Sequence, residues 1–111
     1  MILGIGVDIE EVKNFKENFK DSKFINLLFT KSEIGYCRKK KESYIHFAGK
    51  FCAKEAVIKA YRKNVRIKDV EVINSASGKV FICIRGKKQK NIYCSISHTE
   101  KYAMAFVLIE K

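Results

Sequence analysis

The chain has 111 residues, of which 47% are hydrophobic and 32% charged, and its formal net charge is +11 at pH 7. This length predicts a single domain over residues 1–111 with one modest core, and the absence of proline leaves no linker to divide it. The charge indicates a polyanionic partner, such as nucleic acid, a phosphorylated cofactor or an acidic protein.

The location and the redox state follow from two further features. An acidic residue at position 8 comes too early for a secretory leader, and no apolar run has membrane-spanning length, so we expect a cytoplasmic protein with no membrane contact. The cysteines are widely spaced and form no CxxC pair, which argues against zinc and favours reduced, mostly buried thiols. They are Cys37, Cys52, Cys83 and Cys94.

Residues 2 to 9 alternate in a way that predicts a β-strand. Leu3, Ile5, Val7 and Ile9 face one way, and we expect that apolar face to be packed. Gly4, Gly6 and Asp8 face the other way. The bare glycine face indicates either tight packing of a helix or the close approach of a ligand, and Asp8 is then either a turn residue or a ligand contact.

The next part of the chain is predicted to be helical. Residues 10 to 29 alternate aromatic and aliphatic residues with lysines, which indicates one or two short amphipathic helices with a basic outer face. An N-cap follows, either Thr30 in a capping box with Glu33 or Ser32 itself, and predicts a helix from about Glu33 to Lys40.

A central helix over residues 45 to 61 organises the rest of the chain. Helical spacing places Glu55 within an apolar sector, where a half-buried carboxylate requires a cation or a metal ion. Lys59, four residues later, is one such cation. Lys50 and Lys54 form a like-charged pair that a bound anion would relieve. The alternative is an ordinary amphipathic helix with a Glu–Lys pair and solvated lysines.

The remaining residues predict strands. Residues 69 to 74 and 80 to 85 form a hairpin around Gly78, which we place at a positive φ. A second hairpin joins residues 92 to 98 to the C-terminal strand through a turn at residues 99 to 101. The fold class is therefore α+β, with an antiparallel sheet packed against helices.

Asp8, Glu55 and His98 stand out as chemical candidates. Two carboxylates with few other ligands suit Mg²⁺, which completes its octahedron with water and substrate phosphate oxygens. Lys50, Lys54 and Lys59 on the same helix would hold the remaining phosphate charge. His98 lies at a strand end, in the sequence SISHT.

Four motifs in order resemble one family. GIGVDIEEV, FAGKFCAKEAVIKA, EVINSASGK and SISHTEKYAMA are similar to the holo-acyl carrier protein synthases, which are short 4′-phosphopantetheinyl transferases, and the resemblance runs from Met1 to Glu110. It implies the 4′-phosphopantetheinyl transferase fold and a role in fatty acid and lipid biosynthesis. The implied reaction transfers phosphopantetheine from coenzyme A to a serine of an apo acyl carrier protein and releases 3′,5′-ADP.

The resemblance also assigns residues. It makes Asp8 and Glu55 the Mg²⁺ ligands and Lys59 the pyrophosphate contact. Lys50, His98 and Thr99 would face the nucleotide and its 3′-phosphate, and the stretch around Gly78 and Lys79 would lie along it. It further implies a homotrimer with each coenzyme A site between subunits. Glu55 is our candidate for the base that accepts the serine proton.

Two departures from the family pattern affect the periphery. Only GKKQKN stands where family members usually carry a helix, between residues 85 and 92. The first helix carries lysines where the family tends to place arginines to bind the acidic carrier, and a lysine lacks the bidentate fork. These residues are Lys13, Lys16, Lys20 and Lys23. The competing hypothesis is a small basic nucleic-acid-binding module, which would leave Asp8 and Glu55 without a role.

Overall fold

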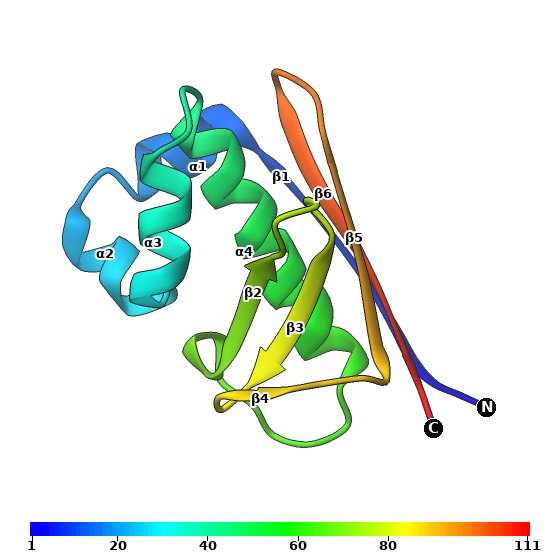
Figure 1. The fold of residues 1–111 in the computed structure, drawn as a ribbon. Coiled ribbons are helices and arrows are strands. Elements are labelled where there is room, and N and C mark those ends of the chain that lie inside the picture. The colour runs from blue at the N-terminus through cyan, green and yellow to red at the C-terminus, as the bar shows by residue number, and fades with distance from the viewer.

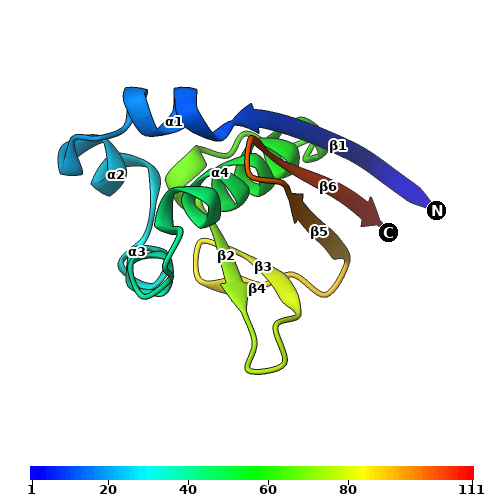
Figure 2. The ribbon, with the colours of Figure 1, turned by 90° about the horizontal axis from the view of Figure 1, so that it is seen from above.

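The computed structural model describes all 111 residues, and its central element is helix α4, Ser43–Ala60. Its inner positions are small or apolar, and Ala48, Cys52, Ala53 and Ala56 are fully buried. The small side chains let neighbouring backbones come close. Seen from above, α4 lies between strand β1 and the β2–β3 hairpin (Figure 2). The predicted central helix is confirmed, beginning two residues earlier than expected.

The first sheet contains the two ends of the chain. Its order is β1 (Ile2–Glu11), β6 (Tyr102–Glu110) and β5 (Ile92–His98), and all its pairings are antiparallel. The N- and C-termini therefore lie side by side at one edge of the molecule (Figure 1). Alternate residues of β6, from Ala103 to Ile109, are buried against α4.

The apolar face of β1, which we expected to be packed, is the exposed one, and of the two alternatives for the glycine face the structure confirms tight packing of a helix. Its glycine face packs on α4: a Cβ at Gly4 would lie 2.1 Å from the Ala60 carbonyl oxygen, and one at Gly6 would lie 2.0 Å from that of Ala56. Ile5, Val7 and Ile9 are exposed instead. The strand approaches the helix backbone so closely that no side chain fits between them, and so the larger residues must point away.

The second sheet follows α4 and a short 3₁₀ turn at Ile67–Asp69. It contains β2 (Val70–Asn74), β3 (Val80–Ile84) and the two-residue strand β4 (Lys87–Lys88). Gly78 has a φ of +86° in the β2–β3 turn, as predicted. The strands thus form two three-stranded sheets, whereas a single sheet was predicted. Strand β4 and its turns lie between residues 85 and 92, where members of the family usually carry a helix.

Three short helices cover one end of α4 (Figure 1): α1 (Val12–Asn18), α2 (Ser22–Leu28) and α3 (Lys31–Arg38). The region 10 to 29 therefore forms two helices. Thr30 and Glu33 form the capping box at the start of α3, which decides between the two predicted caps. Phe15 on α1 is buried against Phe51 on α4, with ring centroids 5.4 Å apart. No helix in the structure is both long and apolar enough to cross a membrane.

Candidate functional site

The first group of candidate residues lies where β1 passes α4. Lys59 Nζ, on α4, donates to Asp8 Oδ1 at 3.1 Å and to the Val7 carbonyl oxygen at 3.0 Å. The Lys59 side chain is 53% exposed, whereas that of Asp8 is 15% exposed. We predicted Lys59 as the partner of Glu55, but its ion pair is with Asp8. The sheet thus supplies the carboxylate and the helix the cation.

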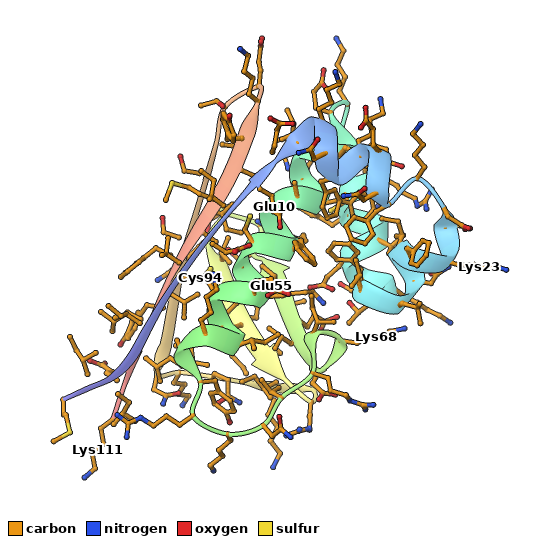
Figure 3. The ribbon with its side chains drawn as sticks, turned by 180° about the vertical axis from the view of Figure 1, so that it is seen from behind. Glu10, Lys23, Glu55, Lys68, Cys94 and Lys111 are labelled. Carbon is orange, nitrogen blue, oxygen red and sulfur yellow. The ribbon has the colours of Figure 1, made fainter.

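Glu55 lies on the same side of α4, half buried. Burial raises the pKa of its carboxyl group, the nearby Asp8 raises it further, and Lys59 opposes the shift. Glu10, two residues after Asp8 on β1, is raised in pKa by burial and then by Asp8 and Glu55. Figure 3 shows Glu10 and Glu55 on one face of the molecule. Three carboxylates therefore concentrate negative charge beside a single lysine, and we call Asp8, Glu10, Glu55 and Lys59 the carboxylate site.

This arrangement fits a divalent cation. Asp8 Oδ2 is buried and has no hydrogen-bond partner, which is costly for a carboxylate oxygen unless a ligand occupies it. No cluster of three metal-binding side chains forms in the protein. A hard cation held by Asp8 and Glu55 would therefore take its other ligands from water and substrate oxygens, as Mg²⁺ does.

A second group surrounds a cleft of about 190 Å³ between α4, α3, β5 and the β2–β3 hairpin. It brings together three of the residues predicted to contact a nucleotide: Lys50, Gly78 and His98. We call this the histidine cleft. Its polar lining contains basic and neutral groups and no carboxylate: Tyr36, His46, Lys50, Asn74 and His98.

Lys50 is fixed within this cleft. Its Nζ donates to the Val72 carbonyl oxygen at 2.8 Å and to Asn74 Oδ1 at 2.6 Å, and it lies 4.5 Å from the centre of the Tyr36 ring. Burial lowers its pKa. These bonds use two of the three ammonium protons, so one remains for a ligand in the cleft.

Lys54 contradicts its predicted role as a phosphate contact. Its side chain is fully buried, and its Nζ lies 2.7 Å from Glu33 Oε1 and donates to the Leu28 carbonyl oxygen at 2.9 Å. Glu33 in turn accepts from the backbone of Val72 at 2.7 Å. Lys54 therefore binds α4 to α3 and β2 from inside the core, where no ligand reaches it.

Two other predicted contacts lie outside the cleft. Lys79 is exposed beyond Gly78 and faces a different groove, beside Phe81 and Tyr93. Thr99 lies in the β5–β6 turn, where its Oγ1 accepts from the backbone of Lys101 and Tyr102. Neither side chain lines the histidine cleft.

His46 belongs to the cleft, and sequence reasoning missed it. Its ring centroid is 5.8 Å from that of His98 and 6.2 Å from that of Tyr36. The available signal was its position one turn before Lys50 on a helix already chosen as functional. That signal is weak because the partner ring lies on a distant strand.

The two groups lie on opposite sides of α4. His46 and Glu55 are nine residues apart, about two and a half turns at 3.6 residues per turn. The carboxylate site faces β1, and the histidine cleft faces the β2–β3 hairpin, with α4 between them (Figure 2). The chain therefore holds two groups of candidate residues that face different directions.

The four lysines of the first helices form a basic surface. Lys13, Lys16, Lys20 and Lys23 are all exposed, and Lys16 lies 5.7 Å from the centre of the Tyr44 ring. Lys13 and Lys16 border a shallow cleft with Lys41. This surface can attract an acidic partner.

The chain matches known proteins along nearly its whole length. Residues 4–107 match the family model described as the 4′-phosphopantetheinyl transferase superfamily. The chain belongs to this superfamily. It is 42% identical to the holo-[acyl-carrier-protein] synthase of Thermodesulfovibrio yellowstonii over 98% of this chain and 99% of the relative. It is 39% identical to that of Protochlamydia amoebophila over 97% and 98% of the two chains.

Solved structures of this transferase superfamily have the same fold. The holo-(acyl-carrier-protein) synthase of Bacillus anthracis, solved in complex with CoA (3′,5′-ADP), superposes with a TM-score of 0.85 at 30% identity, covering 100% of this chain and 98% of that one. The Helicobacter pylori enzyme, in complex with coenzyme A, gives 0.80 at 26% identity over 96% and 99% of the chains. The predicted family, fold class and transferase activity are confirmed, which decides against a nucleic-acid-binding module.

Proposed function

We infer that this protein is a holo-acyl carrier protein synthase, which transfers the 4′-phosphopantetheine group of coenzyme A to a serine of an apo acyl carrier protein. The products are the holo carrier and 3′,5′-ADP, and the pathway served is fatty acid biosynthesis. The observation that carries this conclusion is the match of nearly the whole chain to enzymes of that name. The carboxylate site and the histidine cleft supply the charged groups that this transfer requires.

We propose that Asp8 and Glu55 hold Mg²⁺. Asp8 Oδ2 has no hydrogen-bond partner and the pKa of Glu55 is raised, so both carboxylates carry negative charge that a bound cation would stabilise. A bound Mg²⁺ would neutralise pyrophosphate charge and so favour departure of the nucleotide. Lys59, half exposed beside Asp8, adds a positive charge that can reach a substrate phosphate.

The protein's own residues account for proton and charge transfer. The serine oxygen forms a bond to the β-phosphorus while the bond from that phosphorus to the leaving 3′,5′-ADP breaks. The serine proton passes to Glu55, directly or through one water molecule. Lys59 stabilises the charge that gathers on the leaving group.

We propose that a complete active site forms between two subunits of a homotrimer. The carboxylate site of one subunit would face the histidine cleft of its neighbour, because one coenzyme A cannot reach both sides of α4 in one chain. Supporting this, the outer face of the first sheet is apolar and exposed, with Val7 at 51%, Ile9 at 61% and Phe106 at 43%. Val7 and Phe106 are paired in register, so the apolar surface is continuous.

Further contacts and context complete the proposal. Thr99 and Lys79 would reach the nucleotide from the rims of the shared site, and Lys13, Lys16, Lys20 and Lys23 would receive an acidic face of the carrier protein.

We propose one functional domain over residues 1–111, supported by a single core of 21 buried residues. A cytoplasmic location is supported by four cysteines that are all free thiols.

The test is direct transfer. The purified protein, incubated with coenzyme A, Mg²⁺ and an apo acyl carrier protein, is expected to add one phosphopantetheine mass to the carrier, read by mass spectrometry. Asp8→Asn and Glu55→Gln should remain folded and lose transfer, whereas Glu42→Gln, at the far end of α4 from Glu55, should remain active. An unmodified carrier with the unaltered protein would overturn the proposed reaction.

Mg²⁺-dependent transfer at the normal rate by either carboxylate variant would overturn the metal site alone. As a readout independent of activity, Mg²⁺ should raise the melting temperature of the unaltered protein and leave that of Asp8→Asn unchanged.

A further inference from the structure

Two imidazoles face each other in the histidine cleft. His46 on α4 and His98 on β5 have ring centroids 5.8 Å apart and ring planes at 68°. Gly49 makes this possible, because a Cβ there would lie only 3.0 Å from Ile96 Cγ2 on β5. The missing side chain lets β5 approach α4. His46 lies one turn before Gly49 on α4 and His98 lies two residues after Ile96 on β5, so the two rings come together.

The surroundings of the pair are cationic. Lys50 offers one remaining proton to the cleft after bonding Val72 and Asn74. Lys40, just beyond α3, lies 4.8 Å from the centre of the Tyr36 ring, which itself packs on His46. No carboxylate lines the cleft. A phosphate group is the ligand chemistry that such a lining favours.

In the unliganded protein this cationic setting disfavours a charge on His46. Burial lowers its pKa first, and His98, Lys40 and Lys50 lower it further. The groups that face His46 are therefore Tyr36 of α3, Lys40 beyond that helix, Lys50 of α4 and His98 of β5. An anion placed among them would reverse the balance, because it attracts each cation and stabilises a proton on the imidazole.

We propose that His46 and His98 together bind the 3′-phosphate of coenzyme A and that binding takes up a proton on this imidazole pair. The inference rests on the proposed function and deepens it by adding His46 to the binding residues. Lys50 supplies the fixed positive charge, and the pair supplies a charge that appears when the phosphate binds.

Proton uptake makes affinity depend on pH. A group whose pKa is low in the free protein and higher in the complex binds its proton along with the ligand, so affinity falls as pH rises through the neutral range. A phosphate monoester itself has a second pKa of about 6, so the contribution of the imidazole is read against a His46 variant. Between about pH 8 and about pH 6, the unaltered protein should gain about tenfold in affinity for coenzyme A relative to that variant, the gain expected from one hydrogen bond to a charged group.

The experiment is calorimetric binding of coenzyme A at these two pH values, each in two buffers of different ionisation enthalpy, so that protons taken up can be counted. His46→Phe keeps an aromatic ring against Tyr36 and His98 but cannot bind a proton. It is expected to bind coenzyme A more weakly than the unaltered protein at both pH values, to lose most of the tenfold relative gain at about pH 6 and to take up fewer protons. His46→Gln keeps a donor and should show the same loss of pH dependence.

Dephospho-coenzyme A, which lacks the 3′-phosphate, identifies the group that is bound. It should bind with no proton uptake, and the same uptake as coenzyme A would overturn the assignment to the 3′-phosphate. An unchanged pH dependence in both folded His46 variants would overturn the role of His46. Failure of the unaltered protein to bind coenzyme A at either pH would instead count against the proposed function.

Discussion

Lys50, Lys54 and Lys59 all lie on α4, but they differ in burial, and this difference decides the role of each side chain. Lys59 is half exposed and pairs with Asp8 at the carboxylate site. Lys50 is buried at the wall of the histidine cleft and bonded to backbone and amide oxygens. Lys54 is fully buried against Glu33. The first two remain within reach of a ligand, and the third holds the core together.

Lys54→Met should destabilise the fold strongly. Glu33 is only 1% exposed and would keep two backbone donors but lose its ammonium partner, and breaking a buried ion pair on one side costs about 3–5 kcal/mol. Urea unfolding at a fixed protein concentration measures the loss. The exposed Lys20→Met is the control and should change stability by less than about 0.5 kcal/mol. Equal stability of the two variants would contradict the structural role of Lys54.

Glu55→Gln should stabilise the metal-free protein at neutral pH. Burial and Asp8 raise the pKa of Glu55 above 4.5, so the folded state binds its proton more tightly than the unfolded state. The ionised carboxylate therefore costs stability that appears as pH rises through the acidic range. Melting curves should separate variant and parent at neutral pH and converge at about pH 4. A difference that is the same at both pH values would contradict this electrostatic origin.

At the scale of secondary structure, the contact of β1 with α4 places the carboxylate site. Gly4 and Gly6 let the strand lie directly on the helix backbone, and Asp8 then continues along the same face toward Lys59. Any side chain at these glycines would push the strand outward. The geometry of the site therefore depends on two residues that have no side chain of their own.

Gly6→Ala tests this contact. Its new Cβ would lie 2.0 Å from the Ala56 carbonyl oxygen, so the backbones must separate at a cost of about 1–3 kcal/mol or more. Gly35→Ala on α3 is the matched control, because a Cβ there meets nothing within 4 Å and should stabilise the helix by about 0.5–1 kcal/mol. Thermal unfolding compares the two, and equal effects would refute the close strand–helix contact.

Local patterns predicted most elements of this fold. The alternation of β1, the capping box at Thr30 and the positive φ of Gly78 all depend on neighbouring residues, and the structure confirms them. The alternation could not say which face of β1 is packed. Both faces have the same period, and the glycine face is buried only because α4, far along the chain, lies against it.

The site was harder to predict for the same reason. Asp8 and Glu55 were chosen by residue type and helical position, and the structure brings them to one side of α4. The pairing of Lys54 with Glu33 and that of Lys59 with Asp8 arise only when distant elements meet. Helical spacing placed Lys50 and Lys54 on one flank but gave no indication that Lys54 faces the core.

Over the whole molecule, charge is unevenly arranged. The net charge of +11 includes the exposed lysines of α1 and α2, while the carboxylates of β1 and α4 gather on another side. On the proposed function, such separation would guide the acidic carrier protein and the cofactor to different places.

Lys13→Glu combined with Lys16→Glu should raise the KM for the carrier protein about tenfold and leave the KM for coenzyme A nearly unchanged. Steady-state kinetics at low and high salt provide the measurement, since added salt should weaken carrier binding by the unaltered protein. Lys87→Glu with Lys90→Glu changes the net charge equally on the exposed β4 region and is the control. A rise in both KM values, or an equal effect of the control, would place carrier docking elsewhere.

In the proposed homotrimer, each active site joins the carboxylate site of one subunit to the histidine cleft of another. Glu55→Gln and His98→Ala damage different halves, so a mixed oligomer can contain a site in which both halves are intact. The test requires that each variant be severely impaired alone, which is measured first. The two proteins are then unfolded together, refolded, and assayed for transfer of phosphopantetheine to the carrier. We predict that the mixture recovers part of the activity while each variant refolded alone stays inactive. Mixed oligomers that form but remain inactive, or a protein that is a monomer in solution, would contradict the claim.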